Sequence, residues 1–76
     1  MFEVLAHGEN FIRVRNDDYS YLFKCEETSI KNDLVIDRII GLAKGFVEYN
    51  YFSNLKALMR LGWTLSSREE LYDDFW

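Results

Sequence analysis

The chain has 76 residues, of which 49% are hydrophobic and 17% aromatic, and it carries a net charge of −4. This length predicts one domain, residues 1–76, that buries only about 60–65% of the surface exposed by its unfolded chain. The acidic balance disfavours duplex DNA, the RNA backbone and anionic lipid as main partners, and it favours a basic partner.

The cysteine content and the first residues predict a cytoplasmic protein, in the host cell cytoplasm if the gene belongs to a phage. Cys25 is the one cysteine, whereas small secreted domains normally contain several. The first stretch, MFEVLAHGENF, has an acidic residue where a signal peptide needs basic ones. No apolar run approaches the roughly 20 residues of a membrane span, so we expect no membrane partner.

Residues 2–25 predict a three-stranded antiparallel β-meander. They contain three runs without helical periodicity, FEVLAH, FIRVR and YSYLFKC, separated by the turn-like clusters GEN and NDD. With three residues in each loop, the strand pairs are Glu3 with Arg15, Leu5 with Arg13, His7 with Phe11, Arg13 with Tyr21 and Phe11 with Phe23. This register assigns one face to the core, formed by Phe2, Val4, Ala6, Ile12, Val14 and Leu22. The opposite face carries Leu5, Phe11, Arg13, Tyr19, Tyr21 and Phe23.

The residues after the meander predict three helices packed on the core face of the sheet, which makes the fold class α+β. The apolar residues from Ile36 to Val47 recur at the spacing of one helical stripe, so a helix is expected from Lys31 to Glu48. A short helix capped by Ser53 carries Leu55, Leu58 and Met59 and ends at Gly62, in a left-handed conformation. Ser66 and Ser67 each precede a glutamate by three residues, which predicts a third helix through Trp76. The expected core consists of Val4, Ile12, Val14, Leu22, Ile36, Ile39, Ile40, Ala43 and Leu58.

The expected third helix concentrates acidic side chains. Two apolar rows, Leu71 with Phe75 and Tyr72 with Trp76, dock it on the domain. The carboxylates of Glu69, Glu70, Asp73 and Asp74 cover the rest, and the last two oppose the helix dipole. We expect these four residues, joined by Asp17 and Asp18 of the second hairpin, to form an acidic partner-binding surface. A solvated face that keeps the protein soluble is the simpler interpretation.

The residues that catalysis requires are few and far apart. His7 and Cys25 lie on different predicted strands, and one histidine with one cysteine does not make a tetrahedral metal site. Gly41 and Gly45 lie inside a helix, where glycines ease close packing more readily than they bind phosphate. We therefore expect no enzyme activity, no metal and no cofactor.

Two patterns resemble those of nucleic-acid-binding modules. The stretch NLKALMRLGWTLSSREEL has the outline of a helix-turn-helix, but residues 68–76 contain one basic and four acidic residues. The aromatic sheet face, with Arg13 and Arg15 among its rings, has residue types that stack single-stranded bases. Glu3, Asp17 and Asp18 surround that face and disfavour single-strand binding, as the acidic residues 69–74 disfavour the helix-turn-helix. Protein binding is therefore favoured over both.

The balance of features favours binding to another protein. The leading hypothesis is a small, acidic, non-catalytic inhibitor from a phage or mobile element, such as an anti-CRISPR, anti-restriction or nuclease-immunity protein. It would act as a nucleic-acid mimic on a larger, basic, nucleic-acid-handling protein. The alternative is an accessory or structural homo-oligomer, for example a homodimer. Its self-interface would be the aromatic sheet face, with Phe11, Arg13, Tyr19, Tyr21 and Phe23.

Overall fold

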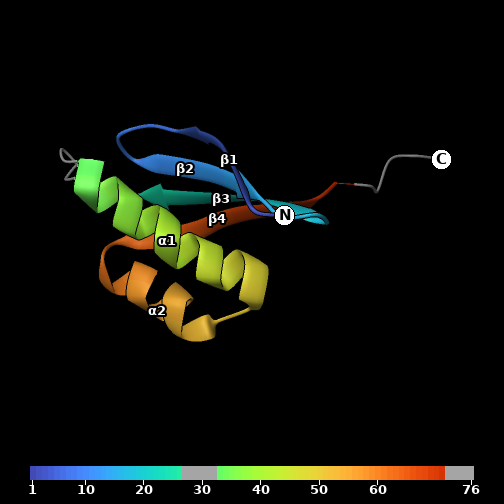
Figure 1. The fold of residues 1–76 in the computed structure, drawn as a ribbon. Coiled ribbons are helices and arrows are strands. Elements are labelled where there is room, and N and C mark those ends of the chain that lie inside the picture. The colour runs from blue at the N-terminus through green and yellow to red at the C-terminus, as the bar shows by residue number, and fades with distance from the viewer. Residues whose placement is uncertain (27–32, 72–76) are drawn as a thin grey trace.

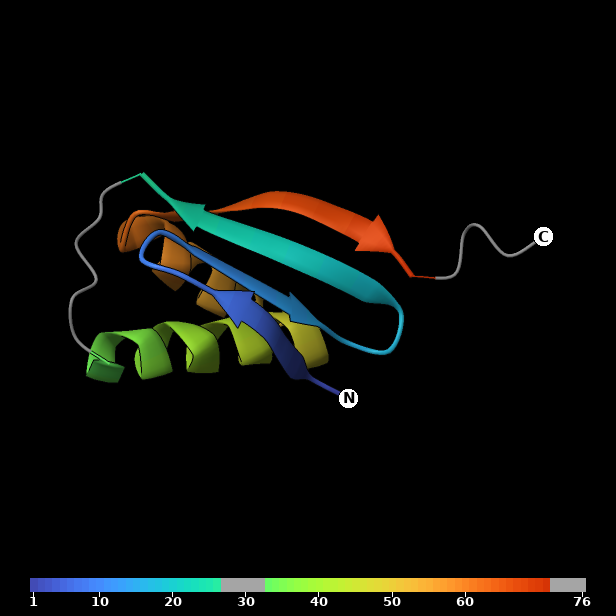
Figure 2. The same ribbon diagram turned by 90° about the horizontal axis from the view of Figure 1, so that it is seen from above.

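The computed structural model describes residues 1–26 and 33–71, and it has an α+β fold in which two helices cover one face of an antiparallel sheet (Figure 1). The strands are β1 (Glu3–His7), β2 (Phe11–Arg15), β3 (Tyr19–Cys25) and β4 (Trp63–Glu70), and the helices are α1 (Asp33–Tyr49) and α2 (Phe52–Arg60). The sheet order is β1-β2-β3-β4, so β1 and β4 form its edges (Figure 2). The α+β class is confirmed, whereas the expected three strands and three helices are four strands and two helices in the described residues.

The third helix predicted from Ser66 onward is wrong, because residues 63–70 form strand β4. Burial alternates from Trp63, which is 1% exposed, through exposed Thr64 and half-buried Leu65, as it does in a strand with one face on a core. Pairing with β4 also satisfies the backbone groups along the second edge of β3. The remainder of the predicted helix, residues 72–76, lies outside the described residues.

The predicted strand register is correct at one pair and shifted elsewhere. Glu3 faces Arg15 as expected, but an irregularity between Val4 and Ala6 places Ala6, and not Leu5, opposite Arg13, and His7 opposite Ile12. Between β2 and β3 the register differs by one residue, so that Arg13 faces Leu22 and Phe11 faces Lys24.

A one-residue shift exchanges the two faces of a strand, and here it reverses the assignment of β3. Tyr21 and Phe23 are buried beneath the helices, and Tyr19 packs against the same core. Leu22 is half-buried and is not part of this cluster. In this register β3 buries the rings of Tyr21 and Phe23 in place of the smaller side chain of Leu22, and therefore removes more apolar surface from water.

The core lies between the sheet and the helices. Five of the expected core residues are buried: Ile12, Val14, Ile39, Ala43 and Leu58. Val4, Ile36 and Ile40 pack against them while remaining partly exposed. Residues not expected there complete the buried cluster, namely Tyr21, Phe23, Cys25, Val47 and Trp63.

The two helices agree with the periodicity, although their ends differ in detail. The described part of α1 begins at Asp33, and the predicted first residues, 31 and 32, lie outside the described residues. Helix α2 is capped at Tyr51 without a side-chain hydrogen bond, so the predicted Ser53 cap is wrong. Gly62 has the expected left-handed conformation, with φ of 90°. None of the described helices is long and apolar enough to cross a membrane.

Candidate functional site

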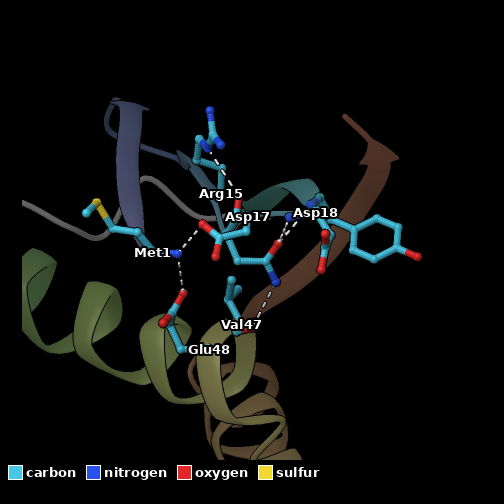
Figure 3. Close-up of polar contacts among 8 residues, drawn as sticks. Met1, Arg15, Asp17, Asp18, Val47 and Glu48 are labelled. Carbon is cyan, nitrogen blue, oxygen red and sulfur yellow. Dashed lines mark hydrogen bonds and ion pairs between the residues drawn. The ribbon is translucent and has the colours of Figure 1, made fainter. Parts of the chain in front are cut away.

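The turn between β2 and β3 is organised by the side chain of Asn16 (Figure 3). Its Oδ1 atom accepts hydrogen bonds from the backbone N–H groups of Asp18 and Tyr19, both at 2.8 Å. The backbone N–H of Asn16 donates to the carbonyl of Tyr19 at 3.0 Å. An asparagine that bonds the backbone two and three residues on is a common way to fix a tight turn. The backbone of the two aspartates that follow Asn16 is therefore fixed by the turn, and their side chains are exposed.

Asn16 also ties this turn to the end of α1. Its Nδ2 atom donates to the carbonyl of Val47 at 3.1 Å, which is one of the last carbonyls of the helix (Figure 3). Carbonyls in the last turn of a helix have no partner within the helix, so a side-chain donor there satisfies an otherwise open acceptor. The β2–β3 turn and the end of α1 consequently lie at the same end of the molecule.

The N-terminal amine makes a second connection at this end. It binds the carboxylate of Asp17 and lies 3.6 Å from that of Glu48 (Figure 3). The hydrogen bond from this amine, followed by its charge, lowers the pKa of Asp17. The same contacts, led by the hydrogen bond to Asp17, raise the pKa of the amine. The amine and the Asp17 carboxyl are consequently both charged near neutral pH.

The end of β4 brings two more carboxylates to the same place. Glu70 pairs with Tyr19 and Glu69 pairs with Ser20, and the backbone N–H of Leu71 donates to the carbonyl of Asp18 at 2.9 Å. Because successive strand residues point to opposite faces, Glu69 and Glu70 lie on the two sides of the sheet edge. We call the surface formed by Asp17, Asp18, Glu48, Glu69 and Glu70 the acidic end.

Few cations neutralise the acidic end. The described positive groups in its neighbourhood are the N-terminal amine, Arg15 and Arg68. Arg15 donates from Nε to the backbone carbonyl of Asn16 at 3.1 Å. Arg68 lies over the ring of Tyr19, with its Cζ atom 4.7 Å from the ring centroid, which is a cation–π contact. The exposed carboxylates of Asp18, Glu69 and Glu70 therefore have no ion-pair partner among residues 1–26 and 33–71.

The predicted acidic residues meet here in a different arrangement from the expected one. Asp17 and Asp18 do join Glu69 and Glu70, but through a hairpin turn and a strand end instead of along one helix. Asp73 and Asp74 lie outside the described residues. Glu48, which sequence analysis did not assign to this surface, is brought to it by the end of α1.

The predicted aromatic surface is divided between the two sides of the sheet. Tyr21 and Phe23 are buried, and Tyr19 is half-buried under Arg68. Phe11 and Arg13 lie on the open face, where both are half-buried. Within residues 1–26 and 33–71, the exposed aromatic rings belong instead to Tyr49, Tyr51 and Phe52, which lie at the junction of α1 and α2. Their signal in the sequence was the aromatic stretch YNYF directly after the helical periodicity ends.

The groups considered for catalysis lie elsewhere. His7 is exposed on β1, whereas Cys25 is buried on β3, two strands away. A pocket of about 430 Å³ lies at the opposite end of the sheet from the acidic end, and it is lined by Cys25, Glu26, Met59, Arg60, Leu61, Gly62 and Thr64. Among the described residues, no group of three or more His, Cys, Asp or Glu side chains is placed to hold a metal ion.

Comparisons with protein-family models, with curated proteins and with solved structures found no match for this chain. Its function therefore has to follow from the chemistry of its own residues. The densest feature of that chemistry is the acidic end, where residues from three distant parts of the sequence present carboxylates together.

Proposed function

We propose that this protein binds and blocks a larger, basic, nucleic-acid-handling protein, and that it does so without catalysis. The acidic end occupies the surface on which that partner holds nucleic acid. Phage and mobile-element inhibitors directed against CRISPR, restriction or nuclease systems form the functional class that best fits a small acidic protein of this kind.

The observation that carries this proposal is the convergence of Asp17 and Asp18 with Glu69 and Glu70. The hydrogen bond from Leu71 to Asp18 holds the end of β4 beside the β2–β3 turn. Exposed carboxylates on a fixed backbone present negative charge at set spacings, as the phosphates of a nucleic acid do. A basic surface that binds phosphates is the partner that matches such an array.

A second supporting observation is that polar contacts connect the turn of the acidic end to helix α1. The Asn16 side chain connects the turn to Val47, and the amine of Met1 lies between Asp17 and Glu48. Charges that are already in place lose little conformational entropy when a partner binds. Because charged rims mainly steer encounter, we expect the acidic end to raise the association rate and to make binding sensitive to salt.

A charge-matched pair of variants tests this function. The acidic-end variant carries Asp18→Asn, Glu69→Gln and Glu70→Gln, and the distal variant carries Glu9→Gln, Glu26→Gln and Asp37→Asn. Both lose three negative charges, and all six side chains are exposed, so both variants should fold. Affinity capture from host lysate, with the captured protein identified by mass, supplies the partner for kinetic measurement.

The wild type and the distal variant should capture the same nucleic-acid-binding protein, and added DNA should compete with them. The acidic-end variant should associate with that protein several-fold more slowly at low salt. Equal association rates for the two variants, or a captured partner with an acidic binding surface, would contradict the proposal.

The homo-oligomer considered from the sequence would have to use another surface. Tyr21 and Phe23, the centre of its expected interface, are buried between the sheet and the helices. A sizing measurement at high protein concentration separates this alternative from the inhibitor, because an inhibitor of this kind does not need to self-associate.

A further inference from the structure

Three aromatic side chains are exposed where α1 passes into α2. Tyr49 is 57% exposed, Tyr51 56% and Phe52 66%. Single exposed apolar residues are common on protein surfaces, but three large rings within four residues form a cluster. We call Tyr49, Tyr51 and Phe52 the aromatic turn.

The backbone of the aromatic turn is fixed. Asn50 has a φ of 58°, in the left-handed region that ends many helices. Its N–H donates to the carbonyl of Phe46 at 3.0 Å, and the N–H of Tyr51 donates to the carbonyl of Gly45 at 3.2 Å. The carbonyl of Tyr51 in turn accepts from the N–H of Asn54 at 3.0 Å.

The rings are supported by other rings. The Tyr49 and Tyr51 centroids lie 5.5 Å apart, and Phe52 contacts Phe46 with their centroids 5.9 Å apart. Phe46 itself packs edge-on against Tyr21 and Phe23 in the core, at 6.1 and 6.3 Å. The aromatic turn is therefore continuous with the core, and its rings need little rearrangement when a partner binds.

The aromatic turn borders the acidic end. Glu48 directly precedes Tyr49 and shares the N-terminal amine with Asp17, and Asn16 binds the last turn of the same helix. In Figures 1 and 2 the end of α1, the β2–β3 turn and the end of β4 all lie at one end of the molecule. Rigid aromatic anchors bordered by charged residues are the usual composition of a binding hot spot and its rim.

We propose that the aromatic turn is the apolar anchor of the partner interface, and that it inserts into an apolar depression bordered by lysine and arginine side chains on a basic partner protein. This inference rests on the proposed function and specifies the partner surface for the same site. A second copy of this chain does not fit, because pairing two aromatic turns would also bring two acidic ends together.

Two synthetic peptides of equal charge serve as probes of this surface. The apolar-centred peptide is Lys-Arg-Leu-Phe-Arg-Lys and the polar-centred peptide is Lys-Arg-Ser-Ser-Arg-Lys, both with blocked termini. Burial of the two apolar side chains against the rings should make the wild type bind the first peptide about tenfold more tightly than the second. NMR shifts should map the first peptide to the aromatic turn and to Asp18.

The variant Tyr51→Ser with Phe52→Ser should bind both peptides equally, because only the apolar contact is lost. Its matched control is Met59→Ser with Leu61→Ser, since these side chains are 55% and 52% exposed at the other end of α2. The control should keep the tenfold preference. Circular dichroism checks that both variants fold, and Tyr51→Phe, which retains the ring, should also keep the preference.

The outcomes separate this inference from the proposed function. If the wild type binds both peptides equally and salt weakens both, the charge mechanism is supported and the aromatic anchor is overturned. If the tenfold preference survives in the Tyr51→Ser, Phe52→Ser variant, the anchor is likewise overturned. If the polar-centred peptide fails to bind at low salt while the other binds, the anchor is supported and the charge mechanism fails. Sedimentation that shows a dimer lost in this variant would assign the turn to self-association and overturn the inference.

Discussion

The side-chain amide of Asn54 fills the space beside Gly45, where an added Cβ would lie 2.0 Å from Asn54 Nδ2. The same Nδ2 atom donates to the carbonyl of Leu42 at 3.1 Å. The glycine thus allows α2, and not the sheet, to approach α1 closely. Gly41 is different, because a Cβ there would meet no atom of the described structure within 4 Å outside its own helix segment.

Gly45→Ala should lower the free energy of unfolding by about 1–3 kcal/mol, because the new methyl group displaces Asn54 from its hydrogen bond. Gly41→Ala is the control, and it should raise stability by up to about 1 kcal/mol, because alanine is the better helix former. Urea denaturation measures both. Combining Gly45→Ala with Asn54→Ala should cost less than the two changes added separately, and strict additivity would contradict the contact.

Asn16→Ala should lower the free energy of unfolding by about 1–3 kcal/mol, because it removes the donor to Val47 and the acceptor for two backbone N–H groups. Asn16→Ser keeps a side-chain oxygen that accepts hydrogen bonds in the turn, adds no charge and is too short to reach Val47, so its cost should be smaller. Denaturant unfolding of the two variants gives the comparison. Equal costs would mean that the bond to the helix end accounts for the whole effect.

Phe23→Ala should cost about 3–5 kcal/mol, since Phe23 is completely buried. Leu22→Ala should cost only about 1 kcal/mol, since Leu22 is half-buried on the other face of β3. Thermal or chemical unfolding of the two variants tests the strand register directly. A larger loss at Leu22 than at Phe23 would favour the register predicted from the sequence.

The contact between Asp17 and the N-terminal amine should stabilise the fold over a limited pH range. The pKa of Asp17 is lowered from 3.8, so its contribution is present above that value and is lost as the pH falls through the lowered pKa. The pKa of the amine is raised from 8.0, so its contribution is present below that value and is lost as the pH rises through the raised pKa. NMR titration should therefore give an acidic midpoint below 3.8 for the Asp17 carboxyl. Asp17→Asn should bring the amine titration back toward 8.0, and an unchanged amine midpoint would argue against the contact.

The alternation of residues in β1 to β3 and the helical periodicity of α1 could be recognised in the sequence. The structure of residues 63–70 could not, because two local patterns there predict different elements. Ser66 and Ser67 with Glu69 and Glu70 form a helix-start pattern, but Trp63, Thr64 and Leu65 form the beginning of an alternating strand. The pairing with β3 decides between them, because a strand at residues 63–70 bonds to the edge of β3 and buries Trp63 against the core. The edge of β3 exists only once the first three strands have assembled, so the local sequence of residues 63–76 does not predict the pairing with it.

The register between β2 and β3 failed for a related reason. The assumption of three loop residues placed Arg13 beside Tyr21. The Asn16–Tyr19 backbone bond instead places these two residues opposite each other and leaves Asp17 and Asp18 in the turn, which shifts the register by one residue. That shift moved the predicted aromatic interface into the core. The acidic residues at positions 17, 18, 69 and 70 were recognisable in the sequence, because charge does not depend on register, but their grouping required the pairing of β3 with β4.

Strands β3 and β4 are neighbours in the sheet although both helices lie between them in the sequence. Cys25 pairs with Trp63, and Tyr19 pairs with Glu70. During synthesis the β1–β3 meander leaves the ribosome first, with the outer edge of β3 unpaired and the rings of Tyr21 and Phe23 uncovered. An open strand edge beside exposed apolar rings is the feature through which nascent chains associate with one another. The sheet cannot be completed until residues 63–70 have emerged, so the order of synthesis leaves the meander without its fourth strand while the two helices are being made.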